Sequence, residues 1–286
     1  MGRRDTQSGV VLINVLVTLA LASTVLYAMI SLSELSIARS QRYSEAGQAQ
    51  ALIAAAEASL ISALSRDMAE APGSDNLTEG WAQIAQQPVS IAGGSFALVV
   101  EDAQSRINLN SEAMRGAQGA QTLRRIGEAL DLPADVTDRI RARLAQRKPL
   151  ERLDDLIADA GLSPAELVAL RPFLTVLPRS TDVNLNTASE EVIGVLTGNL
   201  AQTASLVAIR ARNGSLAPQD VERAQMIPPP GIGFTSAWFR AIATVRVGTT
   251  TQQVSSLIQR SASADGQRHV GVVARETPFR GSVQGP

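Results

Sequence analysis

One long apolar stretch dominates the pattern of hydrophobic and polar positions along the chain. Residues Val10 to Leu32 are almost all Val, Leu, Ile, Ala or Met. A helix of about 20 such residues is long enough to cross the hydrocarbon core of a bilayer. Arg3 and Arg4 precede the stretch, and the next basic residue is Arg39. The positive-inside rule therefore predicts a cytoplasmic N-terminus and an exported body.

The helical pattern continues beyond this predicted membrane span. Because residues 49–64 are rich in strong helix formers, we predict one helix from about Val10 to about Arg66. Such a helix would be roughly 80 Å long, so its outer half must pack on a soluble domain. The run Ala-Pro-Gly-Ser at 71–74 is expected to end it, and a short helix is expected around Trp81.

Strand patterns lie on both sides of a long helical region. Residues 96–102 predict one strand, and residues 240–247, 252–258 and 268–274 predict three more. Residues 111 to about 234 have helical periodicity instead. The simplest topology pairs the four strands in one antiparallel sheet, with the long helix on one face. The prediction is an α+β fold with a large all-helical domain inserted in the sheet.

These patterns divide the chain into six segments. Within the helical region, helix caps are predicted at Ser163, before Pro164, and at Thr187, ahead of Glu190. The expected boundaries are a leader at 1–9, a transmembrane helix at 10–33, the rest of that helix and the first strand at 34–110, the inserted helical domain at 111–236, the returning strands at 237–276 and a disordered tail at 277–286.

Composition narrows the possible functions. The 286 residues include 26 Lys and Arg against 27 Asp and Glu, so no broad basic field favours nucleic acid. Cysteine is absent, which excludes disulfides and thiol chemistry, and His269 is the only histidine. The serines at 105, 111 and 205 do not lie in a nucleophile-elbow sequence. We therefore predict a protein that is not an enzyme.

The residues around the start of the apolar helix form a recognisable motif. A short basic leader ends in Gly9, directly before an unbroken apolar helix that begins at Val10. This arrangement resembles the signal of type IV prepilins and pseudopilins. The resemblance implies that a prepilin peptidase cleaves between Gly9 and Val10 and methylates the new amine of Val10. The alternatives are a plain uncleaved anchor, or an ordinary signal peptide cut near residues 28–33.

Asn14 departs from the usual pattern of this family. Major members carry Glu at this fifth position of the mature chain, where it is thought to pair with the terminal amine of a subunit already in the filament. A buried carboxylate in hydrocarbon is tolerated mainly when it has a partner. A subunit at the filament tip has no earlier neighbour, so the resemblance makes Asn14 compatible with a tip subunit.

Two near copies of one motif flank part of the helical region. The first, at 106–111, contains Asn108 and Asn110; the second, at 182–188, contains Asn184, Asn186 and Thr187. Each is expected to be a short extended piece that leads into a helix. Together with the leader and the segments 153–157, 161–167 and 170–176, the two copies resemble the K-type minor pseudopilins of type II secretion systems.

This resemblance implies a fold, a place and a set of partners. The fold is the pseudopilin fold, a long N-terminal helix on a small antiparallel sheet, here with the helical insertion. The implied place is the tip of a short periplasmic filament, reached from a single-pass inner-membrane anchor. The implied partners are the I-type and J-type minor pseudopilins, the prepilin peptidase and the inner-membrane secretion platform, with a role in initiating or capping filament assembly for protein export.

The resemblance also raises calcium as a possible cofactor, since some family members bind it. Glu101, Asp102, Asp154 and Asp155 do not have the regular alternation of an EF-hand loop. We therefore interpret them as solvated ends of helices and strands, and predict no certain metal site.

The alternative function is DNA binding by a membrane-anchored protein in uptake. Residues 182–212 resemble a helix-hairpin-helix unit, with the hairpin at 197–200. That motif binds phosphate through backbone amides in a hairpin with two glycines, whereas Leu200 stands at the second position here. Lys and Arg are scarce around it, which argues for a protein-binding scaffold instead.

Overall fold

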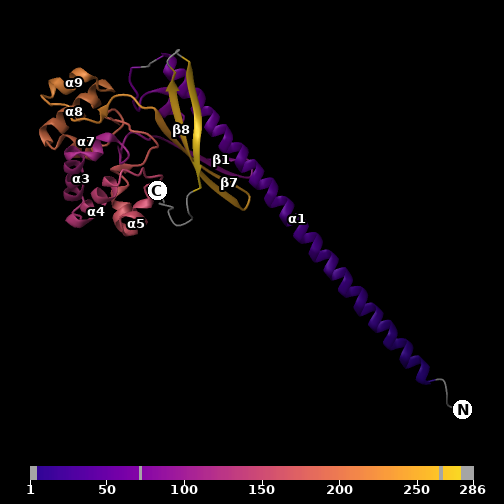
Figure 1. Ribbon diagram of the computed structural model, residues 1–286. Coiled ribbons are helices and arrows are strands. Elements are labelled where there is room, and N and C mark those ends of the chain that lie inside the picture. Colours follow the sequence, from indigo (N-terminus) through magenta and orange to yellow (C-terminus); the bar gives the residue numbers. More distant parts are fainter. Residues whose placement is uncertain (1–4, 71–72, 264–266, 278–286) are drawn as a thin grey trace.

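The computed structural model describes residues 5–70, 73–263 and 267–277. Its longest element is helix α1 (Asp5–Glu70), which forms a shaft that projects from a compact body (Figure 1). The helix has 66 residues, so it is about 100 Å long. It begins before the predicted start at Val10 and ends four residues beyond Arg66. Residues 71 and 72 of the predicted helix end, and all of the predicted tail at 277–286 except Thr277, lie outside the described residues.

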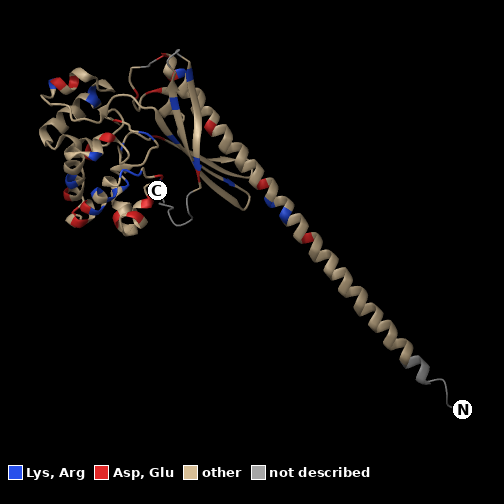
Figure 2. Ribbon diagram, in the orientation of Figure 1, with Lys and Arg blue, Asp and Glu red and all other residues tan. Residues whose placement is uncertain are grey.

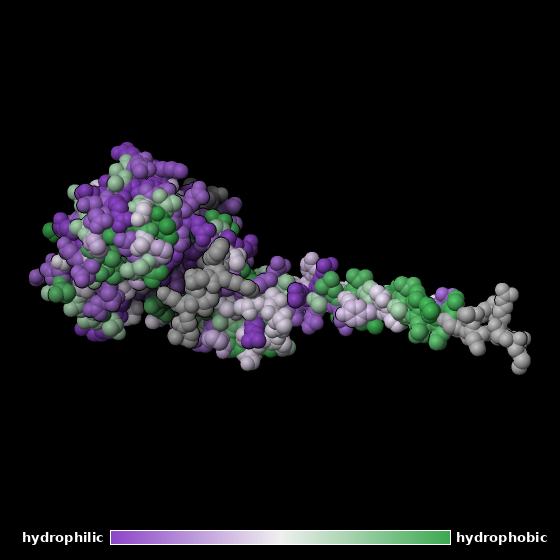
Figure 3. Space-filling model, turned by 90° about the horizontal axis from the view of Figure 1, so that it is seen from below, coloured by the Kyte–Doolittle hydropathy of each residue, from purple (hydrophilic) through white to green (hydrophobic). Residues whose placement is uncertain are grey.

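Only the part of α1 from Glu45 onward packs on the body. No residue between Val10 and Ser44 is buried, and Figure 3 shows hydrophobic residues over this free part of the shaft. From Glu45 onward, one stripe of the helix is buried against the sheet. Its apolar members are Ala49, Ile53, Ala56, Leu60 and Leu64. Their spacing of three or four residues places them on one helix face, as the predicted packing required.

The body contains a five-stranded sheet in which all neighbours are antiparallel. The strand order is β1-β2-β7-β8-β9, so strands distant in sequence lie side by side at β2 and β7. The pseudopilin-like arrangement, with its four predicted strands in one sheet behind the long helix, is confirmed. The strand bounds are β1 Gln86–Ile91, β2 Gly94–Asp102, β7 Trp238–Val247, β8 Thr250–Ala262 and β9 Arg268–Glu276.

The edge strand β1 was missed by the sequence analysis. It contains Pro88, which cannot donate a hydrogen bond and is tolerated mainly on edge strands. Most of its residues are exposed, so it lacks an alternation of buried and exposed positions. Gly93 adopts φ 78° in the turn to β2, a conformation that favours glycine.

An aromatic pair anchors the core between helix and sheet. Trp81, from the short helix α2 (Gly80–Gln83), lies edge-on to Phe239 of β7 with 4.9 Å between ring centroids. Both side chains are fully buried. Edge-to-face contact adds to the hydrophobic gain from burying two large rings. The short helix expected around Trp81 is therefore confirmed.

Residues 103–237, between β2 and β7, form what we call the helical insert. It has its own hydrophobic core, separate from the core under α1. The inserted helical region is confirmed, but it is not all-helical, because two pairs of two-residue strands pair in parallel within it. Its elements are β3 Ile107–Asn108, η1 Glu112–Arg115, α3 Ala117–Ala129, α4 Ala134–Ala145, α5 Asp155–Asp159, α6 Pro164–Leu170, β4 Leu174–Thr175, β5 Val183–Asn184, α7 Glu190–Thr197, α8 Leu200–Asn213, α9 Pro218–Arg223 and β6 Ile232–Gly233.

Candidate functional site

The N-terminal part of α1 is the first candidate site. It is long and apolar enough to cross a membrane, by length and composition. The side chain of Val10 is 58% exposed, and Gly9 lies in the same helix, outside the residues whose surroundings are described. The carbonyl of Asn14 accepts a hydrogen bond from Thr18 Oγ1 at 2.8 Å. Cleavage between Gly9 and Val10 stays a prediction.

The second candidate site is the pair of Asn motifs. In the first copy, Asn108 Oδ1 accepts the backbone N–H of Asn110 at 3.1 Å. Asn110 then bridges two distant loops: its Nδ2 donates to the carbonyls of Leu150 and Leu177, both at 2.9 Å, and its Oδ1 accepts the N–H of Leu150 at 2.9 Å. Both asparagines are buried. The amide side chains thus satisfy backbone groups that would otherwise be buried without partners.

The second copy repeats this geometry. Asn184 Oδ1 accepts the N–H of Asn186 at 3.0 Å. Asn186 Nδ2 donates to the carbonyls of Leu216 and Phe234, at 3.3 and 3.2 Å, and its Oδ1 accepts the N–H of Leu216 at 2.5 Å. As in the first copy, the motif starts at a strand that pairs in parallel with a later one. The insert therefore contains two units with the same arrangement, in which one asparagine side chain donates to two distant carbonyls and accepts one distant backbone N–H. We call this arrangement the Asn clamp.

The predicted helix cap at Thr187 is wrong. Helix α7 is capped by Ser189, whose side chain accepts the N–H of Val192 at 3.2 Å. The hydroxyl of Thr187 donates instead to Asp102 Oδ2 at 2.6 Å. By contrast, the predicted cap at Ser163 is confirmed, and Glu166 completes its capping box.

Asp102 joins the second Asn motif to the sheet. Its Oδ2 accepts from Asn184 Nδ2 at 2.8 Å and from Ser236 Oγ at 2.6 Å, in addition to Thr187. Asp102 is the last residue of β2 and is buried, so its interpretation as a solvated strand end is wrong. Burial raises the pKa of Asp102, while these donors act in the opposite direction.

Two further residues hydrogen-bond across the junction between the sheet and the second Asn motif, and the sequence did not predict them. Gln104 Nε2 donates to the carbonyl of Asp182 at 2.9 Å, and its Oε1 accepts the N–H of Ala237 at 2.7 Å. Ser236 accepts from Asn184 Nδ2 at 3.1 Å and so closes the network. A single Gln or Ser carries no sequence pattern, so only the tertiary structure reveals these roles.

The other candidate carboxylates do not fit a calcium loop. Glu101 pairs with Arg106 at 3.0 Å, and Asp154 pairs with Arg171 at 2.7 Å. Asp155 accepts two backbone N–H groups of its own turn. Each carboxylate has its own protein partner, and they do not converge on one point. We derive no role for calcium at these four residues.

The hairpin between α7 and α8 forms as predicted. Its tip differs from a phosphate-binding turn, because Leu200 takes the place of the second glycine. Gly198 adopts φ 62°, Asn199 caps α8, and Leu200 is 88% exposed. Arg125 donates to the carbonyls of Val195 and Leu196 beside the tip. Figure 2 shows basic and acidic residues interleaved over the insert.

The serines and the histidine considered for catalysis have other surroundings. The Ser111 hydroxyl donates to the carbonyl of Thr181 at 2.5 Å. His269 is an exposed residue of β9, in register with Ser261 of β8. The described residues therefore do not bring His269 and Ser111 together as a nucleophile and its base.

Comparison with known proteins gives one consistent result. No family model matches the sequence. The chain is 24% identical to the type II secretion system protein K of Pseudomonas aeruginosa over an alignment of 315 positions, which covers 96% of this chain and 93% of that protein. In fold it is similar to a chain of the GspK–GspI–GspJ complex from the type 2 secretion system of enterotoxigenic Escherichia coli. That match has a TM-score of 0.63 and 18% identity, and covers 84% of this chain and 99% of the other.

Proposed function

We propose that this chain is a K-type minor pseudopilin of type II secretion and occupies the tip of the periplasmic filament. There it would initiate or cap assembly for the export of folded proteins across the outer membrane. In this role the protein is a structural subunit rather than an enzyme. Its activity resides in how its helix and its body pack against other subunits.

The position of the helical insert carries this proposal. The insert lies at the end of the molecule opposite the N-terminus (Figure 1). If subunits stack with their shafts along the filament axis, the next subunit outward must occupy that end. A folded unit with its own core fills the space instead. A subunit of this shape is therefore suited to the first position, with no neighbour beyond it.

The shaft supplies the anchor and the filament contact. Its free apolar part would hold the protein in the inner membrane as a single pass, with the N-terminus cytoplasmic and the body periplasmic. The secretion platform would then draw it into the filament core. Asn14 fits a tip subunit, because no earlier subunit presents an amine that needs a carboxylate partner.

The I-type and J-type minor pseudopilins are the proposed partners, since the matched structure is a complex that contains GspI and GspJ. One stripe of the segment from Ala46 to Leu64 is buried on the chain's own sheet, so only the rest of that segment can contact partner helices. The small residues left exposed for close helix packing are Ala51, Ala54, Ala55 and Ala58.

Intact mass and N-terminal analysis test the processing step. The membrane-extracted full chain is measured with and without an active prepilin peptidase. We expect a chain that starts at methylated Val10 only when the peptidase is present. A chain that retains Met1 in both samples would contradict the pseudopilin pathway, and a chain cut near residues 28–33 would indicate an ordinary signal peptide.

The position in the filament is tested by labelling. A tag on the insert, for example at exposed Asn213, should appear in electron micrographs only at one end of assembled filaments. Labels along the filament would refute the tip assignment. Salt-sensitive retention of the full chain on DNA would instead support the DNA-uptake alternative.

A further inference from the structure

A cavity of about 670 Å³ opens between the helical insert and the end of the sheet. Insert residues within 179–182 and 233–237 form one wall, and residues 259–262 of β8 with the start of β9 form the other. Ligand sites are commonly concave, lie between structural units and have volumes in this range. The cavity does not include the exposed alanines of the shaft, so it is a separate candidate binding site.

Two arginines of the lining carry a charge that the protein does not use. Arg179 belongs to the insert, and Arg268 is the first residue of β9, on the other wall. Both residues are exposed. Neither guanidinium forms a hydrogen bond or an ion pair with a residue that the structure describes. The cavity therefore has a positive group on each wall that is left for a bound molecule.

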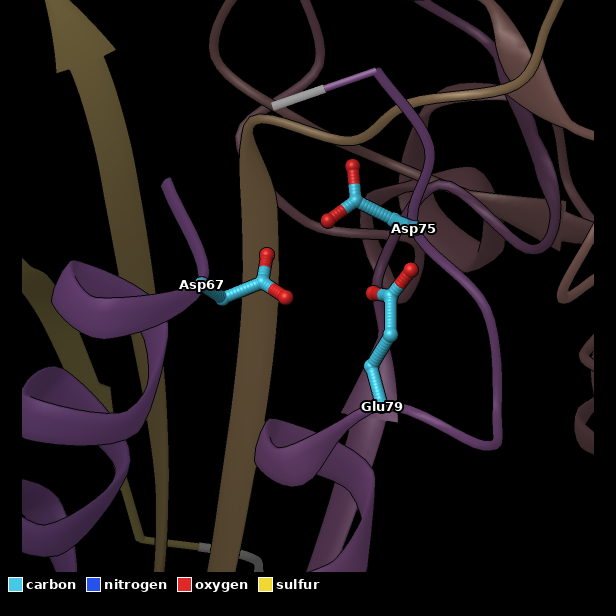
Figure 4. A group of neighbouring side chains, drawn as sticks. All are labelled: Asp67, Asp75 and Glu79. Atoms are coloured by element: carbon cyan, nitrogen blue, oxygen red, sulfur yellow. The ribbon is translucent and has the colours of Figure 1, made fainter. Parts of the chain in front are cut away.

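Arg260 also lines the cavity, but the protein itself occupies its guanidinium. It donates to Asp67 Oδ2 at 2.8 Å, to Asp75 Oδ2 and to the carbonyl of Ser236 at 2.7 Å. Figure 4 shows the two carboxylates, together with that of Glu79. Arg260 is therefore part of the scaffold of the cavity rather than a group for binding a ligand.

Two hydroxyl groups next to Arg179 can add hydrogen bonds to the same ligand. Ser180 Oγ accepts the N–H of Glu112 at 3.1 Å, and Thr181 Oγ1 accepts from Asn108 Nδ2 at 3.1 Å. Each hydroxyl also has a proton of its own to donate, and within the described part of the chain neither proton has an acceptor. This wall thus presents donors, which match the oxygens of a carboxylate.

One carboxylate, that of Asp182, also lines the cavity. Desolvation raises the pKa of Asp182, and none of the described residues donates a hydrogen bond to lower it. A bound molecule with its own N–H donors would stabilise this carboxylate. A peptide has such donors, whereas the phosphates of a nucleic acid offer only acceptors and further negative charge. The combination of donors and one acceptor therefore favours a polypeptide.

The rest of the lining includes apolar side chains. Met68 comes from the last turns of α1, Trp238 begins β7, and Ala262 ends β8. A small inorganic anion would leave these side chains in water. An extended peptide would instead place alternate side chains on opposite sides, so an acidic residue and an apolar residue could meet different parts of the cavity.

We propose that this cavity binds an extended acidic segment of a partner protein, whose carboxylates pair with Arg179 and Arg268. The segment would contact the insert through Arg179 and the sheet through Arg268. Gln104 and Ser236, which hydrogen-bond across the junction between sheet and insert, line the same cavity. Binding would therefore also stabilise the attachment of the insert. The proposal does not depend on the position of the chain in a filament, so the two can fail separately.

Fluorescence anisotropy tests the binding. The probe is a short labelled peptide of alternating glutamate and valine, titrated with the full chain in detergent. The matched probe has glutamine in place of glutamate. We expect saturable binding of the acidic peptide that weakens as salt is added, because salt screens exposed charges. The glutamine peptide should bind at least about tenfold more weakly, as expected for the loss of two ion pairs. Equal binding of the two peptides would overturn the proposal.

Charge-removing variants locate the site. Arg179→Gln and Arg268→Gln should each weaken binding of the acidic peptide roughly threefold, as for an exposed ion pair, and about tenfold together. The matched controls are Arg212→Gln on the insert and Arg246→Gln on the sheet, because both arginines are exposed and lie outside the cavity lining. If the double variant binds the peptide as tightly as these controls, the cavity is not the site.

Filling the cavity gives a test that leaves the charges unchanged. Ser261 is an exposed residue near the end of β8 that lines the cavity, and aromatic residues are well tolerated in strands. Ser261→Tyr should weaken peptide binding at least as much as the double arginine variant and leave the unfolding midpoint unchanged. Undiminished binding would contradict the proposal. Tighter binding of a labelled single-stranded oligonucleotide, lost in the same variants, would identify a nucleic-acid site instead.

Discussion

Asn184 Nδ2 lies 2.8 Å from Asp102 Oδ2, and this hydrogen bond joins the second Asn motif of the insert to the last residue of β2. The same Nδ2 also donates to the carbonyl of Asp75 and to Ser236 Oγ. One buried amide thus holds together segments that are far apart in sequence. The attachment of the insert depends on polar geometry as well as on apolar packing.

Loss of this amide should loosen the junction. Asn184→Ala leaves the buried Asp102 carboxylate with one donor fewer, and we expect a loss of about 2–3 kcal/mol in the free energy of unfolding. Denaturant unfolding of the full chain in detergent measures this. Asn213→Ala, at an exposed position of α8, serves as the control and should be near neutral. Equal effects of the two substitutions would argue that the Asn184 side chain does not stabilise the attachment of the insert.

The two Asn clamps should act independently. Asn110→Ala removes the acceptor of the Leu150 N–H, and Asn186→Ala removes the acceptor of the Leu216 N–H. We expect each substitution to speed amide exchange roughly fivefold or more at its own leucine, because a lost hydrogen bond costs about 1 kcal/mol. Exchange at the other leucine is the internal control. Acceleration of both would mean that the two units open together.

The start of α7 offers a test of the corrected cap. Ser189→Ala should cost about 1 kcal/mol, since the N–H of Val192 loses its acceptor. Thr187→Val instead removes a donor from buried Asp102, so its effect should resemble that of Asn184→Ala. Circular dichroism during denaturant unfolding measures both. A negligible effect of Ser189→Ala would argue against Ser189 as the cap of α7.

Acid should weaken the contact between shaft and sheet at Glu57. Hydrogen bonds from Arg275, followed by one from Ser256, lower the pKa of Glu57 below its ordinary 4.5. A carboxyl with a lowered folded-state pKa contributes stability that is present above the unfolded pKa and is lost as the pH falls through the folded pKa. Stability should therefore drop below about pH 4.5.

Glu57→Gln isolates this contribution. The variant cannot ionise at that position, so its stability should fall less steeply with acid than that of the unchanged chain. Measuring the unfolding midpoint from pH 7 to 3 compares the two. Parallel curves would show that Glu57 does not carry the acid sensitivity.

The sequence predicted the fold best where a hydrophobic pattern extended over many residues or where a motif was repeated. The shaft, four strands and the extended Asn motifs followed from local pattern. The partners of those motifs did not, since Asn110 bridges residues 40 and 67 positions away. Asp75 and Arg260, separated by 185 positions, carry no local signal of their pairing. Strand β1 was not predicted, because it contains Pro88 and lies at an exposed edge, where buried and exposed positions do not alternate.

From Val10 onward, the first buried residue of α1 is Glu45, which accepts hydrogen bonds from Thr249 and Thr250 at the tip of the β7–β8 hairpin. Residues 10–44 of the shaft contain no proline and no glycine, so this segment has none of the residues that commonly kink a helix. The free part of α1 before Glu45 is about 60 Å long at about 1.5 Å per residue, which is about twice the thickness of a bilayer core. A rotation or tilt of its N-terminal end is therefore transmitted through a stiff helix to the part of α1 that packs on the sheet from Glu45 onward.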